Sequence, residues 1–406
     1  MKPQLTHEIL VAGAGPAGMT AALLLASAGH DVALAGAASS GDRRTVALMN
    51  PALQILDRVG VGGAAIEAGA PLRQMRIVDA SSRLIRAPTV SFSAAEIGEP
   101  HFGINIPNAD LNGLLADAVA RESRIARLDA NISDWRPVAD CVHATLSDGR
   151  EIAARLAVAA DGRESPAREA AGISVRRHAL PQSALVLSFA HSRDHGFTST
   201  EFHTESGPFT QVPLPGLRSS LVWVLDPAEA EALMVVDDAE MSRRIENRMQ
   251  SMLGKVEVEP GRQLYPLSTA RPSSFAARRI ALVGEAAHVF PPIGAQGLNL
   301  GLRDVEDLAA SLRGASVDPG APAVMADYNR RRWPDVTSRA TAVNLLNRSL
   351  LSGMLPAQLG RSLGLGLLAA VPPLRGFFMR EGMRPGSGFS ALPRLREKDR
   401  PEEVRS

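Results

Sequence analysis

The sequence predicts an α/β protein with additional α+β elements: a Rossmann-like domain, an inserted antiparallel sheet and a C-terminal helical extension. Three observations support this prediction. A buried-strand pattern leads directly into Gly13-x-Gly15-x-x-Gly18, strand patterns dominate from Ser183 to Asp226, and helical periodicity resumes after Gly297. With 406 residues, 45% of them hydrophobic, the chain is long enough to bury two or three cores.

The bulk composition excludes several classes of protein. The 44 Lys and Arg residues nearly balance the 43 Asp and Glu residues, so we expect no nucleic-acid partner. A single cysteine, Cys141, excludes a disulfide framework and a thiolate metal cage. Because a strand pattern already begins at Glu8–Ile9, no room is left for a targeting segment, and we expect a cytoplasmic protein.

The N-terminal segment from Glu8 to Gly36 reads as strand, glycine turn, helix, strand. Pro16 stands where the first helical turn tolerates a missing N–H, and Gly29 is a plausible helix stop. In this context the three glycines let backbone N–H groups and the helix N-terminus approach a pyrophosphate. The segment therefore predicts a dinucleotide site.

The acid that normally ends the second strand of this motif and binds the ribose hydroxyls is missing. Its place falls on Gly36 or close to it, and no acid occurs between Val32 and Gly41. The ribose must be held differently, with Ser39, Ser40 and Asp42 as candidates, or less tightly.

Two further segments each combine an apolar strand with a turn. The first runs into Asp161-Gly162, which in isolation favours a plain turn. The second is a strand at Ile280–Val283 that ends in Gly284-Glu285 and continues into the loop "PPIGAQG". A helix is expected to start near Leu298–Asn299, and its free N–H groups favour a nearby anion.

Together, these three segments resemble the fingerprints of the single-component flavin-dependent aromatic hydroxylases, the family of para-hydroxybenzoate hydroxylase. Three further segments are more similar to the ubiquinone-biosynthesis branch of this family. They are "RRTVALMNPALQILDRVGV", "GAQGLNLGLRDVEDLA" and the C-terminal "GLGLLAAVPPLRGFFMREGM". The resemblance implies an FAD-binding domain formed by 1–75, 100–178 and 265–320, a substrate domain formed by 76–99 and 179–264, and a C-terminal helical region over 321–406.

The resemblance also implies roles for individual residues. A glutamate, Glu285, stands where the family usually has an aspartate that binds a ribityl hydroxyl. Asn108 is a candidate for cofactor binding, and a position in an ordinary helix N-cap region is an equal alternative for it. No protein catalytic residue is implied, because the flavin carries the chemistry. The cofactor-binding candidates are Gly13, Gly15, Gly18, Arg44, Asn108, Asp161, Glu285, Pro292, Gly297, Leu298 and Asn299, and the ring wall is assigned to Pro292, Gly294 and Gly297.

The implied activity is hydroxylation of the aromatic ring of a polyprenylated ubiquinone precursor through a flavin hydroperoxide, with FAD, O2 and NAD(P)H or a reductase partner. Proline and glycine walls would exclude water, and N–H groups near Leu298 would stabilise charge on reduced flavin. His288 is interpreted as a structural residue rather than a base.

The strand-rich region from Ser183 to Asp226 corresponds to the family's substrate platform. Phe209, Gln211 and Trp223 could face the pocket or the core. The scattered histidines, His191, His195 and His203, favour no metal site.

The apolar C-terminal segment from Arg361 to Phe378 is interrupted by Pro372 and Pro373, so we do not expect it to span a membrane. It suits a lipid surface, a polyprenyl tail or a partner subunit, and packing on the protein's own core is an equal alternative. Peripheral contact with the inner face of the membrane and participation in a quinone-biosynthesis complex follow as expectations.

Two other functions stay open at this stage. One is a flavin hydroxylase of another substrate on the same scaffold. The other is a non-catalytic FAD-binding accessory subunit of a quinone-biosynthesis complex, since Gly36 and Glu285 depart from the family pattern.

Overall fold

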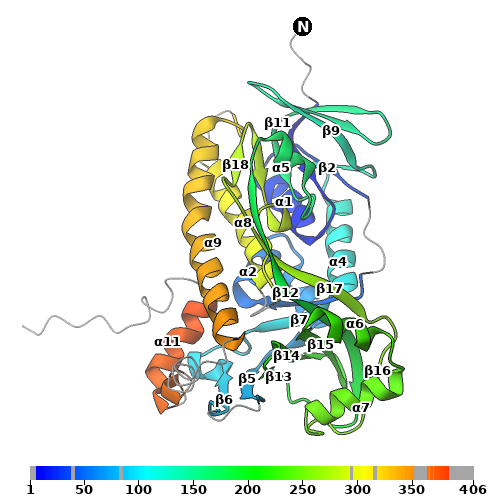
Figure 1. Cartoon of the computed structure of the whole chain (residues 1–406). Helices are drawn as coiled ribbons and strands as arrows, with labels where there is room; N and C mark the ends of the chain where they lie inside the picture. Colours follow the sequence, from blue (N-terminus) through cyan, green and yellow to red (C-terminus); the bar gives the residue numbers. More distant parts are fainter. Residues whose placement is uncertain are drawn as a thin grey trace, which may run out of the picture.

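The computed structural model describes residues 6–37, 42–81, 86–292, 296–313, 318–351, 364, 366–368 and 370–383. Within them the chain forms two large sheets, one above the other in Figure 1, with the long helix α9 (Pro322–Leu351) running along one side. The predicted α/β class with an inserted antiparallel sheet is confirmed.

The first sheet has a parallel centre that carries the glycine motif. Its main path runs β18-β19-β11-β1-β2-β8, and in the parallel register Val11 of β1 faces both Leu34 of β2 and Val158 of β11. The strands are β1 (His7–Ala12), β2 (Val32–Ala35), β8 (Ile125–Leu128), β11 (Glu151–Ala159), β18 (Ala276–Ala277) and β19 (Ile280–Leu282), with β9 (Ile132–Pro137) and β10 (Val142–Leu146) extending from β11.

The helices around this sheet bury its apolar strands. Helix α1 (Pro16–Ser27) is apolar on nearly all sides, because it packs against both α4 (Asn108–Arg121) and α8 (Gln296–Leu312). Helix α8 begins at Gln296, slightly before the expected start, and the predicted apolar face is buried at Val305, Leu308, Ala309 and Leu312. Shorter helices are α2 (Asn50–Arg58), α3 (Gly62–Ala68) and α5 (Pro166–Ala170).

The second sheet follows the order β16-β12-β15-β14-β13-β5-β6, with β17 also paired to β12. All of its strand pairs are antiparallel except β13 with β5. The strands are β5 (Gln74–Asp79), β6 (Val90–Ser93), β12 (Val175–His191), β13 (Thr198–His203), β14 (Pro208–Leu214), β15 (Arg218–Leu225), β16 (Val256–Val258) and β17 (Gln263–Pro272).

One face of the second sheet is covered by α6 (Pro227–Met234) and α7 (Asp238–Arg248) (Figure 1). Phe209, Trp223 and Leu185 join Leu233 and Ile245 from these helices in a separate buried cluster. The opposite face is therefore left for a ligand.

A small third sheet lies between the two large ones. It consists of β3 (Thr45–Met49), β7 (Gly103–Pro107) and β4 (Ala70–Pro71), in the order β3-β7-β4. The C-terminal helix α11 (Pro372–Met383) packs near the turn Ala94–Ile97, where Arg375 pairs with Glu96 at 2.6 Å. No helix in the described ranges is both long and apolar enough to cross a bilayer.

Candidate active site

A cavity of about 780 Å³ lies between the parallel sheet, the small sheet and the free face of the antiparallel sheet. Its lining combines the glycine turn after β1, strand β3, the segment after β19 and residues of α11. Most of the predicted cofactor residues line it: Gly15, Gly18, Arg44, Asn108, Glu285, Pro292, Gly297 and Leu298.

The glycine turn has the shape that a pyrophosphate requires. Gly15 is the N-cap residue of α1, and it has no side chain to cap the helix. A Cβ atom built on Gly15 would meet no atom within 4 Å. A Cβ on Gly18 would lie 1.8 Å from the carbonyl oxygen of Gly13, so the turn closes only with glycine. The unpaired N–H groups of the first helical turn therefore face open space in the cavity and fit a phosphate.

Gly36 occupies the place of the missing ribose acid for a steric reason. A Cβ at this position would lie 2.7 Å from the backbone nitrogen of Ala14. The side chain of Arg127 donates to the Gly36 carbonyl at 2.6 Å, and Asn131 accepts from the N–H of Ala37 at 3.0 Å. Of the alternative ribose candidates, Ser39 and Ser40 lie outside the described residues, whereas Asp42 lines the cavity.

Arg44 is held beside the cavity by Asp42 and Asn108. Arg44 donates to both carboxylate oxygens of Asp42 at 2.8 Å, and Asn108 Nδ2 donates to Asp42 Oδ2 at 2.8 Å. Burial raises the pKa of Asp42, but the hydrogen bonds from Arg44 and Asn108 outweigh it and lower that pKa overall. The Oδ1 atom of Asn108 is buried and has no partner in the described ranges, so it is available to a ligand donor.

Asp161 lies just behind the cavity lining. Its Oδ2 accepts the N–H of Ala167 at 3.1 Å, which ties the turn to α5, while its Oδ1 is buried without a partner among the described residues. Burial raises the pKa of this carboxyl. An unpaired buried oxygen of this kind fits a hydroxyl donor of a bound group.

Glu285 points into the cavity opposite Arg163. The two side chains form a bidentate pair with both N···O distances at 3.1 Å, and both line the cavity. The Glu285 side chain is 49% exposed, so its remaining lone pairs can accept from a ligand hydroxyl. Sequence reasoning missed Arg163, although it directly follows Asp161-Gly162.

The predicted ring wall runs from Pro292 to Asn299, and the structure describes residue 292 and residues 296–299 of it. Pro291, Pro292, Gly297 and Leu298 line the cavity, and Gly294 lies outside the described residues. Asn299 does not line it. Instead its side chain joins α8 to β3, donating to the Ala47 carbonyl at 2.7 Å and accepting from the Met49 N–H at 2.8 Å.

His288 has a structural role beneath this wall, as interpreted from the sequence. Its Nε2 lies 2.8 Å from Asp304 Oδ2, which also accepts the N–H of Gly284 at 2.9 Å. Asp304 is fully buried and lies 2.7 Å from Nε of Arg332 on α9. This buried network fixes the turn that carries Glu285.

The free face of the antiparallel sheet forms the other side of the cavity. Phe209, Gln211 and Trp223 do not line it, so their pocket-facing alternative is wrong. The alternation along each strand turns them to the opposite face, where Phe209 and Trp223 pack under α6 and α7. The lining residues from this sheet instead include Ser199, Glu201, Thr210, Val212, Ser220 and Val222.

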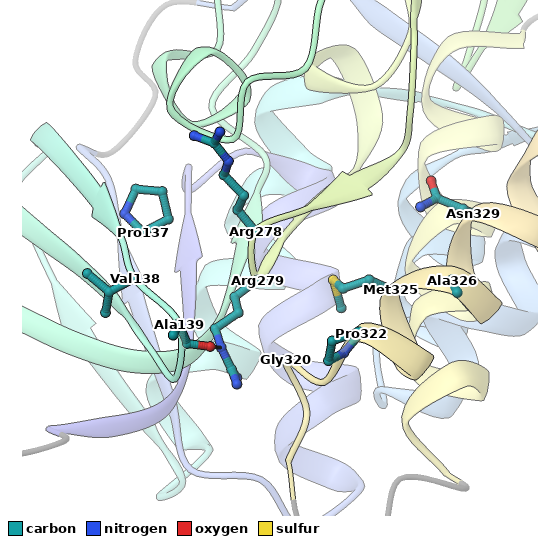
Figure 2. Close-up of a pocket in the computed structure, with 10 residues that line it drawn as sticks. All are labelled: Pro137, Val138, Ala139, Arg278, Arg279, Gly320, Pro322, Met325, Ala326 and Asn329. Carbon is teal, nitrogen blue, oxygen red and sulfur yellow. Dashed lines mark hydrogen bonds between the residues drawn. The ribbon is translucent and has the colours of Figure 1, made fainter.

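A second cavity, of about 590 Å³, shares no lining residue with the first. It lies between the β9–β10 hairpin and the start of α9 (Figure 2). There Arg279 turns towards Ala139 and Gly320, whereas Arg278 points the other way. Within the described residues, no group of three or more His, Cys, Asp and Glu side chains could hold a metal ion.

Comparison with known proteins agrees with this geometry. The sequence pattern of the family described as "FAD binding domain" matches residues 6–342. The chain belongs to this FAD-binding family. The glycine turn, which is open at Gly15, and the unpaired oxygens of Asn108 and Asp161 fit the FAD that the family binds.

Relatives of this FAD-binding protein include ubiquinone hydroxylases. It is 34% identical to ubiquinone hydroxylase UbiL of Rhodospirillum rubrum, over 93% of this chain and 89% of the relative. It is 28% identical to 3-demethoxyubiquinol 3-hydroxylase of Escherichia coli, over 88% of this chain and 93% of the relative. The resemblance to the ubiquinone-biosynthesis branch of FAD-dependent hydroxylases is thereby confirmed.

Solved structures share the same fold. PqsL, a probable FAD-dependent monooxygenase from Pseudomonas aeruginosa, superposes with a TM-score of 0.76 at 22% identity, covering 89% of this chain and 99% of its own. The p-nitrophenol 4-monooxygenase PnpA from Pseudomonas putida gives a TM-score of 0.75 at 19% identity, covering 94% of this chain and 97% of its own. The protein is an FAD-dependent monooxygenase by its family.

Proposed function

We propose that the protein hydroxylates the aromatic ring of a polyprenylated ubiquinone precursor, using FAD, O2 and either NAD(P)H or a reductase partner. The observation that carries the proposal is one cavity that joins the FAD-binding turn to apolar residues of the C-terminal helix. The relatives named as ubiquinone hydroxylases support the substrate class.

The chain's own residues would hold the cofactor from both ends. The N-terminus of α1 at Gly15 would bind the pyrophosphate, and Arg44, Asn108, Asp161 and Glu285 would accept or donate hydrogen bonds along its length. When bound and reduced, FAD supplies an electrophilic oxygen derived from O2. The protein then needs to orient the ring, exclude water and place charge.

The ring wall suits these tasks. Pro291, Pro292 and Phe290 present an apolar surface without exchangeable protons, and the first turn of α8 at Gly297 and Leu298 offers unpaired N–H groups. The positive end of this helix would stabilise negative charge on a reduced ring beside it. Arg44 is kept charged at the same cavity by its hydrogen bonds to Asp42, which raise its pKa.

The C-terminal helix supports a substrate with a long apolar tail. Phe378, Met379 and Gly382 of this helix line the cavity together with Leu368, which precedes it, and Phe378 is also 51% exposed. Leu367 and Val371 add apolar surface nearby, at 53% and 36% exposure. We propose that a polyprenyl chain leaves the cavity along this helix, towards the inner face of a membrane on which the protein lies peripherally or towards a quinone-biosynthesis complex.

We also propose the domain division that the resemblance implies. Residues 1–75, 100–178 and 265–320 would bind FAD, residues 76–99 and 179–264 would cover the substrate, and residues 321–406 would form the helical extension.

The visible absorption spectrum of the purified protein, with FAD added if it is colourless, is the first test. A bound-flavin spectrum that bleaches with NAD(P)H and returns in air supports the proposal, and product from a prenylated phenol, detected by mass spectrometry, completes it. Failure to retain FAD and to consume reductant favours the accessory-subunit alternative. Turnover of a water-soluble phenol with no preference for a prenyl group favours a hydroxylase of another substrate.

A further inference from the structure

One carboxylate on the substrate side of the cavity has no arginine partner. Three carboxylates of the described chain line the cavity: Asp42, Glu285 and Glu201. Asp42 pairs with Arg44 and Glu285 pairs with Arg163, and both lie on the cofactor side. Glu201 alone lies on the substrate sheet, in β13, and its charge is not neutralised by a guanidinium in the described ranges.

Glu201 is instead held by a histidine two residues further along the same strand. His203 and Glu201 share one face of β13 because side chains alternate, and His203 Nε2 lies 2.7 Å from Glu201 Oε1. Since an ionised carboxylate only accepts, Nε2 carries the hydrogen of this bond. The other ring nitrogen, Nδ1, is buried and has no hydrogen-bond partner among the described residues.

The second oxygen of Glu201 remains available to a ligand. Its only protein partner in the described chain is the Thr210 hydroxyl, which donates to Oε2 at a long 3.4 Å. The Glu201 side chain is 20% exposed, and that exposure is towards the cavity that it lines. A half-buried acceptor in this position is suited to a hydroxyl group of the substrate.

The strands on either side add few competing charges. Strand β14 contributes no ionisable side chain. Strand β5 contributes Arg76, which also lines the cavity, and Asp79, which stands in register with His203. The Asp79 carboxylate accepts hydrogen bonds from the Ser81 hydroxyl and from the Ala87 N–H.

We propose that Glu201 is the catalytic residue that accepts the proton of the substrate's ring hydroxyl, and that His203 is the residue that positions it. The inference rests on the proposed function. As the ring carbon attacks the electrophilic oxygen, the bond that joins this oxygen to its donor breaks and the donor keeps the electron pair. The phenolic O–H bond breaks at the same time, its proton moves to Glu201 Oε2 and its electron pair forms the C=O bond of the ring. The ring then loses its carbon-bound proton to the donor, the C–H electron pair restores the aromatic ring, and Glu201 returns its proton to the ring oxygen, so the carboxylate is regenerated.

The test uses full-length, FAD-loaded enzyme that is reduced chemically without oxygen and then mixed with oxygenated buffer and a short-chain 2-prenylphenol. Product is measured by mass spectrometry, so no natural electron donor is needed. We expect E201Q to form product about 100-fold more slowly than wild type at pH 7, with unchanged FAD content. E257Q, at an exposed position of β16 in the same sheet, is the matched control and should match wild type.

A proton acceptor has a signature that a structural residue lacks. The rate of E201Q should rise by about tenfold per pH unit towards the phenol pKa of about 10, because the substrate then ionises in solution. A ring-fluorinated, more acidic prenylphenol should restore the rate at pH 7. His203→Gln keeps an N–H donor and should retain most activity, whereas His203→Leu should resemble E201Q.

Three outcomes would overturn the inference in different ways. Equal rates for wild type and E201Q would show that Glu201 takes no part. A loss that is the same at every pH and with the fluorinated phenol would make Glu201 structural. Reduced wild-type enzyme that binds prenylphenols and yields no hydroxylated product would instead contradict the proposed function on which the inference rests.

Discussion

Two glycines three residues apart serve the cofactor site in opposite ways. Gly18 is needed for the fold, because any side chain there would collide with the Gly13 carbonyl. Gly15 is free of neighbours and keeps space open for the ligand itself. Glycine is therefore required at position 18 for internal packing, and at position 15 for access of the ligand to the helix N-terminus.

Alanine substitutions should separate these two requirements. Gly15→Ala should change the free energy of unfolding of the apoprotein by no more than about 0.5 kcal/mol, because φ is −81° and the methyl group meets no atom. Its FAD affinity should fall by about tenfold or more, since the methyl stands where a phosphate approaches. Gly18→Ala should destabilise the apoprotein by about 3 kcal/mol. Urea unfolding and FAD titration measure the two effects, and equal stability losses would refute this division.

Asp161 should show a conflict between stability and cofactor binding. Burial raises its folded pKa above the ordinary value of 3.8, so ionising it costs stability. This penalty is absent below the unfolded pKa, grows as pH rises towards the folded pKa and is complete above it. Asp161→Asn removes the charge and should make the apoprotein more stable than wild type at pH 7, with the difference vanishing as pH falls below about 4. FAD affinity should fall in the same variant, because the unpaired Oδ1 becomes a donor.

Among the secondary-structure elements, the two-residue turn between β18 and β19 carries unusual backbone strain. Arg278 and Arg279 have φ values of 48° and 63°, in the left-handed region that hairpin turns of this type normally fill with Asn or Gly. Arg279 compensates through its side chain, which binds Asp318 at 2.7 and 2.8 Å and the Ala139 carbonyl at 2.7 Å. Arg278 has no hydrogen bond within the described residues, and Figure 2 shows it directed away.

The two arginines of this turn should respond oppositely to substitution. Arg278→Gly should stabilise the protein by about 0.5–1 kcal/mol by relieving the strain, whereas Arg278→Ala, the control, keeps the strain and should give no gain. Arg279→Ala should cost about 2 kcal/mol, because it leaves Asp318 and the carbonyls of Ala139 and Arg155 without their partner. Chemical denaturation measures all three. A loss of stability in Arg278→Gly would show that its side chain contributes a contact that outweighs the strain.

At the scale of the whole molecule, the cavity depends on parts of the chain that are far apart in sequence. Cofactor-side residues come from the parallel sheet and α8, substrate-side residues come from the antiparallel sheet, and α11 contributes further lining residues. The Asn299 side chain joins α8 to β3, and Arg375 joins α11 to Glu96. A change in the C-terminal helix can therefore alter substrate binding without touching the cofactor.

A charge in the C-terminal helix tests this separation. Phe378→Glu should raise KM for a long-chain prenylphenol by about tenfold or more, because the lost apolar contact is worth about 1.5–3 kcal/mol. KM for the unprenylated phenol and FAD affinity should be unchanged. Val235→Glu, at an 85% exposed position outside the cavity lining, is the matched control. Steady-state kinetics with both phenols decide the matter, and an equal loss for both would place Phe378 in the fold rather than in a tail contact.

The parallel sheet could be read from the sequence because its signals are local. Strand Val32–Ala35 and the burial of Leu308 on α8 agree with the predicted hydrophobic patterns. A buried strand and an apolar helix face are both encoded by residues close together in the sequence. The substrate face was harder to predict. Whether Trp223 or Val222 faces the ligand depends on which side of the sheet α6 and α7 cover, and alternation alone does not say. Glu201 could be identified as a candidate site residue only from the structure, in which both sheets line one cavity.

The late position of β19 in the chain has a consequence for synthesis on the ribosome. This strand completes the parallel sheet by pairing with β11, yet β11 ends at Ala159 and β19 begins at Ile280. At about 5–20 residues per second, the apolar edge of β11 waits on the order of ten seconds for its neighbour. The antiparallel sheet is made in that interval, so the substrate-covering part of the enzyme can form before the part that binds its cofactor is complete.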